Sequence, residues 1–155
     1  MSRMLPWATR SRRGVSPLEM LVVVAVASLV LSTAVPAARS ALDGIAVAGE
    51  ARRIASAHLH ARITAIMENR TTLFTVRADS LIIGVVVGAD TAVRWAERGP
   101  AVHDIALSGP TRPMRFSPIG IMAGVTNGTW RLSRGEAQRN VVVSRLGRLR
   151  IVKPE

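Results

Sequence analysis

The sequence predicts an α+β fold, with one long N-terminal helix packed on a C-terminal antiparallel sheet. Residues 20–38 are uncharged and largely apolar, and apolar residues continue at helical spacing as far as residue 66. From residue 71 onward, short alternating or β-branched runs separated by turn residues replace that pattern. A helix followed by consecutive short strands is the order of elements typical of α+β domains.

The composition limits the chain to a few function classes. Its 155 residues fit one compact domain plus a terminal segment. The net charge is +11, and Lys153 is the only lysine among 21 basic residues, so nucleic acid and anionic lipid are compatible partners. Cysteine is absent, which excludes disulfides, thiolate metal sites and cysteine nucleophiles.

The N-terminus has the charge pattern of a targeting segment. No acid occurs before Glu19, and four arginines precede the apolar run: Arg3, Arg10, Arg12 and Arg13. The run is close to the ~20 residues that a helix needs to cross a bilayer. Positive charge should keep this end in the cytoplasm while the rest of the chain crosses. Two alternatives follow: a secretory signal cut after Ala37, or a retained membrane helix processed before the apolar run.

Glu19 distinguishes these alternatives. A carboxylate at the start of an apolar segment is costly, and an ordinary secretory signal has no use for it. Gly14 follows Arg13, and Glu19 lies five positions after Gly14. In these residues the chain resembles the type IV prepilin family, whose signal has a basic leader, a glycine, an apolar or aromatic residue, a short segment and a glutamate. The resemblance implies that a membrane-embedded aspartic peptidase cuts between Gly14 and Val15 and that Val15 is then methylated.

The resemblance to prepilins implies that Glu19 has a role in assembly. It would pair with the free N-terminal amine of a neighbouring subunit, because two charges in lipid are tolerable only when paired. A plain helix-capping role, in which Glu19 meets the positive end of the helix dipole, is compatible with this. Val15 stands where the family usually has phenylalanine, and Pro17 departs from the commoner branched or hydroxyl residue. Pro17 falls in the first helical turn, where its missing N–H costs nothing.

We expect the helix to continue past Pro36 and to end at Asn69-Arg70. Its core-facing stripe is predicted to consist of Ile45, Ala48, Ala51, Ala55, Leu59, Ile63 and Ile66. Strands are predicted at residues 71–78, 80–87, 92–95, 101–107 and 114–116. Asn127-Gly128 is predicted to form a hairpin turn. A second hairpin is expected around Leu146-Gly147, with Arg145 opposite Arg148 and Val143 opposite Arg150.

The C-terminal half resembles the GspH/FimT group of pseudopilins and minor pilins. Three segments carry this resemblance: residues 115–120, 128–132 and 139–150. It implies a single-pass protein of the bacterial inner membrane with a cytoplasmic N-terminus and a periplasmic C-terminal domain. It divides the chain into a leader (1–14), a transmembrane helix segment (15–38), an amphipathic helix continuation (39–70) and a sheet domain (71–155).

No combination of residues predicts catalysis. His58 and His60 form an H-x-H pair, but residues two apart on a helix point to different sides, so a metal site is not expected. His103 stands alone, and neither Ser117 nor Ser144 lies in a nucleophile motif. We therefore expect no enzyme activity, no metal and no cofactor.

The basic C-terminus is the candidate binding site. With the hairpin predicted above, Arg145, Arg148 and Arg150 share one face, and Lys153 lies near the chain end. Guanidinium groups bind phosphate in a bidentate manner, and affinity grows with each contact. Gly147-Arg-Leu-Arg150 resembles a tail that some relatives use to bind DNA during uptake. A solvated basic strand that protects the sheet edge is the alternative.

These observations predict a non-catalytic subunit that primes or caps a type II secretion pseudopilus or a type IV pilus. The expected partners are the prepilin peptidase and methyltransferase, other pseudopilins or pilins, the inner-membrane platform of the assembly machine, and membrane lipid. A minor pilin that binds DNA through the basic hairpin is the second hypothesis. A secreted soluble protein cut after Ala37 is the third.

Overall fold

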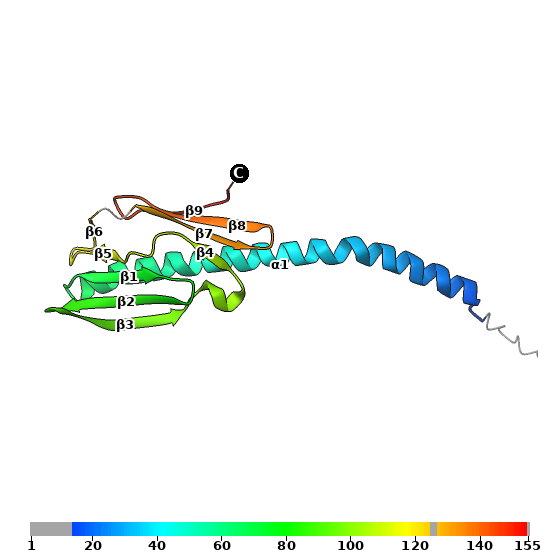
Figure 1. Ribbon diagram of the computed structural model, residues 1–155, viewed down its shortest axis with the longest axis horizontal. Helices are drawn as coiled ribbons and strands as arrows, with labels where there is room; N and C mark the ends of the chain where they lie inside the picture. The colour runs from blue at the N-terminus through cyan, green and yellow to red at the C-terminus, as the bar shows by residue number, and fades with distance from the viewer. Residues whose placement is uncertain (1–13, 125–126, 155) are drawn as a thin grey trace, which may run out of the picture. The chain divides into compact units, whose positions relative to one another are not determined.

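The computed structural model describes residues 14–124 and 127–154, which form one long helix and two antiparallel sheets (Figure 1). The chain divides into two compact units, residues 1–38 and 39–155. In chain order the elements are α1 (Pro17–Met67), β1 (Thr72–Val76), β2 (Ser80–Val87), β3 (Asp90–Arg98), the 3₁₀ helix η1 (Pro100–His103), β4 (Ala106–Ser108), β5 (Met114–Phe116), β6 (Met122–Ala123), β7 (Gly128–Arg134), β8 (Ala137–Val143) and β9 (Leu149–Val152).

Helix α1 begins and ends at residues suited to those positions. The carbonyl of Ser16 accepts the first helical hydrogen bond, from the amide of Met20 at 3.1 Å, so Pro17 is the first helical residue. At the other end Asn69 adopts a left-handed conformation with φ 49°, and the amide of Arg70 donates back to the carbonyl of Ala65. The predicted single helix and its end near Asn69-Arg70 are confirmed.

The strands form two sheets that pack against the second half of α1 (Figure 1). The five-stranded sheet has the order β3-β2-β1-β5-β6 and the four-stranded sheet the order β4-β7-β8-β9. All neighbouring strands are antiparallel. Trp130, Phe74 and Phe116 are the largest fully buried side chains of this core. The predicted α+β fold, with a long N-terminal helix on antiparallel sheet, is confirmed.

Most predicted strands are present, but the strand predicted at residues 101–107 is largely wrong. Residues 80–87 and 114–116 form strands with the predicted bounds. Residues 100–103 instead form η1, and only Ala106–Ser108 is a strand. Pro100 explains the difference, because its fixed φ favours a helical turn. The amide of Ala101 donates to the carbonyl of Ala78 and holds that turn against the β1–β2 connection.

Both predicted hairpins need correction. Gly128 is the first residue of β7 and pairs with Val143 in the four-stranded sheet, whereas β6 pairs with β5 in the other sheet. Asn127-Gly128 therefore lies where the chain passes between sheets and does not join two paired strands. The C-terminal hairpin exists, but Val143 lies opposite Leu149 and Val142 opposite Arg150.

The turn of this hairpin is longer than predicted. The amide of Gly147 donates to the carbonyl of Ser144 at 2.9 Å, and Gly147 has φ 78°. The amide of Arg148 donates to the Ser144 hydroxyl at 3.1 Å. Such a turn, with a left-handed glycine at its end, places three residues between Ser144 and Arg148 and shifts the register.

The core-facing side of α1 differs from the predicted stripe. Of the predicted residues only Ala51 is buried, while Ile45 is 70% exposed. The apolar residues of α1 that are buried are Val47, Ala51, Ile54, Ala57, Ala61 and Ala65. Both stripes have helical spacing, so periodicity alone could not choose between them. Four of these six buried apolar residues are alanines, whose short side chains leave room for the large side chains of the sheets, whereas Ile45 and Ile63 lie on the opposite side of the helix.

His58 and His60 point to different environments, as their spacing requires. His58 is buried, and its ring contacts those of Phe116 and Phe74 edge-on, with centroids 5.1 and 6.4 Å apart. His60 is exposed and packs edge-on against Trp95. Burial, followed by the nearby Arg62 charge, lowers the pKa of His58 to about 4.

Because Ile54 is buried and Ile63 is partly exposed, the same substitution should destabilise the protein by different amounts at these two positions. Ile54→Ala should lower the free energy of unfolding by about 2–5 kcal/mol, because it leaves a cavity under both sheets. Ile63→Ala makes the same chemical change at a partly exposed position and should cost about 0.5 kcal/mol or less. Urea unfolding of the full chain in neutral detergent, followed by near-UV circular dichroism, compares them. A larger loss of unfolding free energy for Ile63→Ala than for Ile54→Ala would instead support the helix face predicted from the sequence.

The buried His58 predicts a loss of stability in mild acid. Its pKa of about 4 in the folded state lies below the ordinary 6.5, so folding favours the neutral ring. Its contribution is fully present above pH 6.5 and is lost as pH falls toward 4, by roughly 3 kcal/mol. Unfolding free energies between pH 7 and 4 should fall less steeply in His58→Phe. His60→Gln is the matched control and should retain the slope. Equal slopes in all three proteins would exclude this origin of the acid sensitivity.

Candidate functional site

The N-terminal segment places the predicted cleavage and assembly residues close together. Gly14 and Val15 are exposed and precede the first helical residue, Pro17. Glu19 lies in the first turn of α1 and is also exposed. None of the four ion pairs found among the described residues involves Glu19. The predicted leader arginines, Arg3, Arg10, Arg12 and Arg13, lie outside the described residues.

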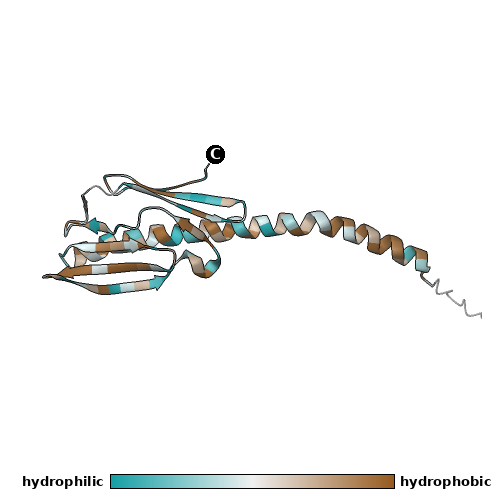
Figure 2. Cartoon of the chain, viewed as in Figure 1, coloured by the Kyte–Doolittle hydropathy of each residue, from teal (hydrophilic) through white to brown (hydrophobic). Residues whose placement is uncertain are grey.

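The apolar part of α1 around Glu19 is not covered by any of the described residues. An 18-residue window of this helix is long and apolar enough to cross a membrane, and none of it is buried. Figure 2 shows the same half of α1 as a nearly continuous apolar segment. Leu18 and Leu21 on either side of Glu19 are 70% and 68% exposed. Among the described residues, Glu19 is thus a carboxylate without an ion-pair partner, set among exposed apolar side chains.

The C-terminal hairpin carries the predicted basic residues. Arg145 lies in the β8–β9 turn, and Arg148 and Arg150 occupy alternate positions that lead into and along β9. All three are exposed, and Arg148 and Arg150 share a face because side chains two apart on a strand do so. Lys153 follows β9 at the end away from the turn, where it lines a shallow hollow with Glu136 and Gln138. Arg148 and Arg150 thus share a face, Arg145 lies in the adjoining turn, and Lys153 lies at the other end of β9.

Two groups of ion pairs, which the sequence did not indicate, connect α1 to both sheets. Arg53 of α1 lies 3.4 Å from Glu50 and 3.7 Å from Glu97 of β3, and it also donates to the carbonyl of Arg98. Arg134 of β7 lies 2.9 Å from Asp43 of α1. These contacts fix one end of each sheet to the helix.

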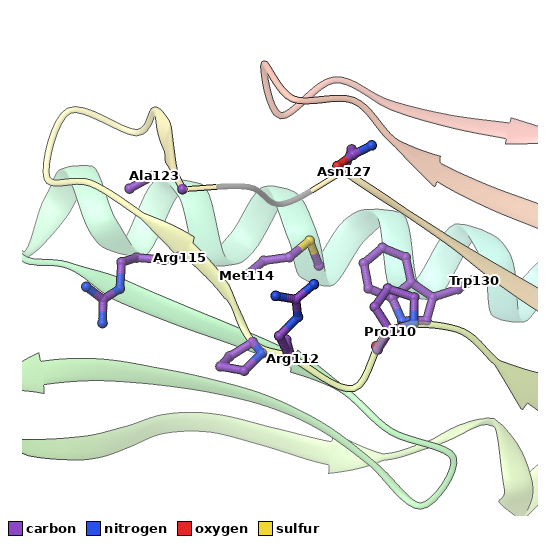
Figure 3. Close-up of a pocket in the computed structure, with 9 residues that line it drawn as sticks. Pro110, Arg112, Met114, Arg115, Ala123, Asn127 and Trp130 are labelled. Carbon is purple, nitrogen blue, oxygen red and sulfur yellow. The ribbon is translucent and has the colours of Figure 1, made fainter.

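A cavity of about 380 Å³ opens between the two sheets, as Figure 3 shows. Its lining comes from the segment before and into β5, from β6 and from the start of β7: Pro110, Arg112, Pro113, Met114, Arg115, Ala123, Gly124, Asn127 and Trp130. Sequence reasoning missed it, because the segments that line it belong to different sheets. The available signal was an arginine held between two prolines, Pro110-Thr-Arg-Pro113.

The remaining candidate residues have structural partners. The Ser117 hydroxyl donates to the carbonyl of Ile121 at 2.9 Å, and the Ser144 hydroxyl accepts from Arg148. Both serines therefore stabilise turns. Within residues 14–124 and 127–154, no three His, Asp or Glu side chains gather in a way that could hold a metal ion.

Comparison with known proteins agrees with this architecture. Residues 50–147 match the family described as type II transport protein GspH. No curated protein matches the chain. A crystal structure of the type IV minor pilin FimU from Pseudomonas aeruginosa matches with a TM-score of 0.58 and 16% identity, covering 68% of this chain and 87% of FimU. A second crystal form of FimU matches with a TM-score of 0.55 and 16% identity, covering 67% and 90%.

The likeness to FimU supports the fold, and the family match covers more than half of the chain. With the N-terminal helix on antiparallel sheets, these findings show that the chain belongs to the GspH family, as a minor pseudopilin or pilin of the GspH/FimT type.

Proposed function

We propose that this chain is a non-catalytic assembly subunit that primes or caps a type II secretion pseudopilus or a type IV pilus. The observation that carries the proposal is Glu19, a carboxylate that takes part in none of the four ion pairs among the described residues and lies on a helix whose apolar half those residues leave uncovered. A charge in lipid is costly alone and tolerable when paired, so this arrangement favours a partner that brings a positive charge.

In this proposal residues 1–14 are a leader that a prepilin peptidase removes. Cleavage between Gly14 and Val15 is supported by their exposed, non-helical position just before Pro17. The new amine at Val15 would be methylated and would lie four residues from Glu19. An amine and a carboxylate at this spacing on each subunit allow Glu19 of one copy to meet the amine of a neighbour.

The proposed anchor is a single membrane pass, residues 15–38, in the bacterial inner membrane. The N-terminus would stay cytoplasmic, and the helix continuation (39–70) and sheet domain (71–155) would lie in the periplasm. Membrane lipid would surround residues 15–38 before assembly. Other pilins or pseudopilins and the inner-membrane platform of the assembly machine would replace that lipid afterwards.

The outer side of the helix continuation supports the same role. Ile45, Leu59, Ile63 and Ile66 are 43–70% exposed on the side of α1 opposite its buried face. Exposed aliphatic side chains that recur along a helix are typical of surfaces that another protein covers. Helices of neighbouring subunits are the partners that a filament would provide.

Removal of the Glu19 charge tests the assembly role. Glu19→Ala should insert into the membrane at least as well as wild type, because it removes a charge from an apolar segment. It should be reduced about tenfold or more in sheared filaments, if one buried charge pair of about 1.4 kcal/mol or more is lost. Immunoblots of membrane and filament fractions measure both quantities.

Two controls accompany this comparison. Mass spectrometry should find an N-terminus at Val15 in both proteins, which separates assembly from processing. Glu136→Ala removes an exposed carboxylate of the sheet domain and should leave filament content unchanged. Equal filament content for wild type and Glu19→Ala would refute the pairing role, and an N-terminus at Ala38 would favour a secreted protein.

A DNA-binding minor pilin is the second candidate function, favoured by the exposed arginines of the β8–β9 hairpin. None of the four ion pairs among the described residues involves Arg145, Arg148 or Arg150. A strand that presents two guanidinium groups on one face, with a third in the adjoining turn, can contact successive phosphates without reading bases.

The salt dependence of DNA binding tests this candidate. Three arginine–phosphate contacts should give a slope of about −2.7 when log affinity is plotted against log salt, and Arg148→Gln with Arg150→Gln should reduce it to about −0.9. Fluorescence anisotropy of labelled duplex DNA with the full chain in neutral detergent measures the slope. Arg52→Gln with Arg77→Gln removes the same charge from exposed positions elsewhere and serves as control. An unchanged slope in the hairpin variant would place binding elsewhere, and no binding at low salt would end this candidacy.

A further inference from the structure

The cavity between the sheets has a preformed apolar floor. Met114 and Trp130 line it, and each side chain is only 2% exposed. The Trp130 indole N–H donates to the carbonyl of Pro110 at 3.1 Å, which fixes the ring against the neighbouring segment. A Cβ atom added to Gly128 would lie 2.6 Å from the Pro110 Cγ atom, so β7 and this segment approach as closely as a glycine permits. The floor is therefore rigid before any ligand arrives.

One cationic group faces this floor. In Figure 3 the Arg112 side chain points toward Met114 and Trp130, whereas the head group of Arg115 points away from them. Arg112 takes part in none of the four ion pairs among the described residues. The described residues that line the cavity include no acid, and the Asn127 amide adds a neutral polar group. The cavity thus combines an unpaired guanidinium, an amide and an apolar floor.

We propose that this cavity binds a carboxylate side chain of a partner protein, presented beside an apolar side chain on a short extended segment. Arg112 would hold the carboxylate through paired N–H···O bonds. The apolar neighbour would cover Met114 and the prolines. A volume of about 380 Å³ lies near the lower end of ligand cavities, roughly 300–1,000 Å³, and suits two side chains.

The shape of the cavity favours a protein segment over nucleic acid. Duplex phosphates lie on a convex surface and do not reach a concave floor. A single-stranded base would need an open aromatic face for stacking, and Trp130 is too buried to provide one. This inference does not require filament incorporation, so its failure would leave the assembly role untouched.

Binding of two matched peptides to the full chain in neutral detergent tests the proposal. The probes are a fluorescently labelled Gly-Leu-Asp-Leu-Gly peptide and its counterpart with Asn in place of Asp. The aspartate peptide should bind about tenfold more tightly, the effect expected when a charge-assisted hydrogen bond is lost. Arg112→Gln should remove that difference, and Arg52→Gln, the matched control on the exposed side of α1, should retain it.

A second readout locates the site. With Trp7 and Trp95 replaced by Phe, the fluorescence of Trp130 should change when the aspartate peptide binds. Because Arg112 is exposed, its Gln variant should fold normally, and far-UV circular dichroism checks this. Equal affinity for the two peptides, no binding of either, or an Arg112→Gln variant that binds like wild type would each overturn the proposal. A labelled oligothymidine that binds in an Arg112-dependent manner, while the aspartate peptide does not, would overturn it in favour of nucleic acid.

Discussion

The alanine-lined face of α1 is the constraint on which the sheet domain depends. Ala51, Ala57, Ala61 and Ala65 are buried, and their side chains end at Cβ, so this face of the helix leaves room for large side chains of the sheets. The sheets supply the bulk of the core in return, with Trp130, Phe74 and Phe116 filling the space that the alanines leave. A larger residue at these helix positions would force the sheets outward.

The same packing decides what the outer side of α1 can do. Val47 and Ile54 lie on the buried face with the alanines, whereas the aliphatic residues Ile45, Leu59, Ile63 and Ile66 remain exposed. On an isolated soluble domain such a surface would be an aggregation hazard. In this chain the exposed side continues from an apolar segment that the described residues leave uncovered, and such a surface suits contact with another protein. One helix thus has a face for its own core and a second face that suits a partner.

The sequence predicted the elements better than it predicted their faces. The helix and strand β2 followed from long periodic or β-branched runs and β5 from a shorter one, and their bounds were close or identical to those of the structure. The buried side of α1 could not be predicted, because two apolar stripes on one helix share the same period. The size match between alanines and the opposing strands decides it, and that match exists only in the folded domain. The hairpin register failed for a local reason, since Ser144 closes a longer turn that ends at the left-handed Gly147.

The candidate sites divide in the same way. Gly14 and Glu19 could be picked out from the sequence, because the signal that they resemble is defined by the spacing of residues along the chain and does not depend on the fold. The cavity at Arg112 depends on segments that meet only when the two sheets share a core, so no spacing along the chain announces it. Pro110 and Pro113 marked a rigid loop at most.

Acids and arginines of the described residues differ in whether they take part in ion pairs, which indicates where part of the net charge of +11 lies. Four of the acids, Asp43, Glu50, Glu68 and Glu97, are taken up in ion pairs with Arg53, Arg94 and Arg134. Some arginines of the described residues that take part in none of these ion pairs lie around β6, and others, such as Arg52 and Arg77, lie elsewhere. Arg115 lies on β5, which pairs with β6, and the turn that holds Arg145 lies beside Met122, since a Cβ atom on Gly147 would meet its side chain at 2.9 Å.

Neighbouring unpaired guanidinium groups repel one another and favour an anionic partner at this end of the sheets. Charge alone does not distinguish a phosphate from a carboxylate, because both suit the guanidinium fork. Shape does distinguish them. The exposed face of β9 is open, whereas the cavity with the floor of Met114 and Trp130 is concave. If both proposals above hold, this difference in local shape, and not net charge, would separate a nucleic-acid backbone from a carboxylate side chain.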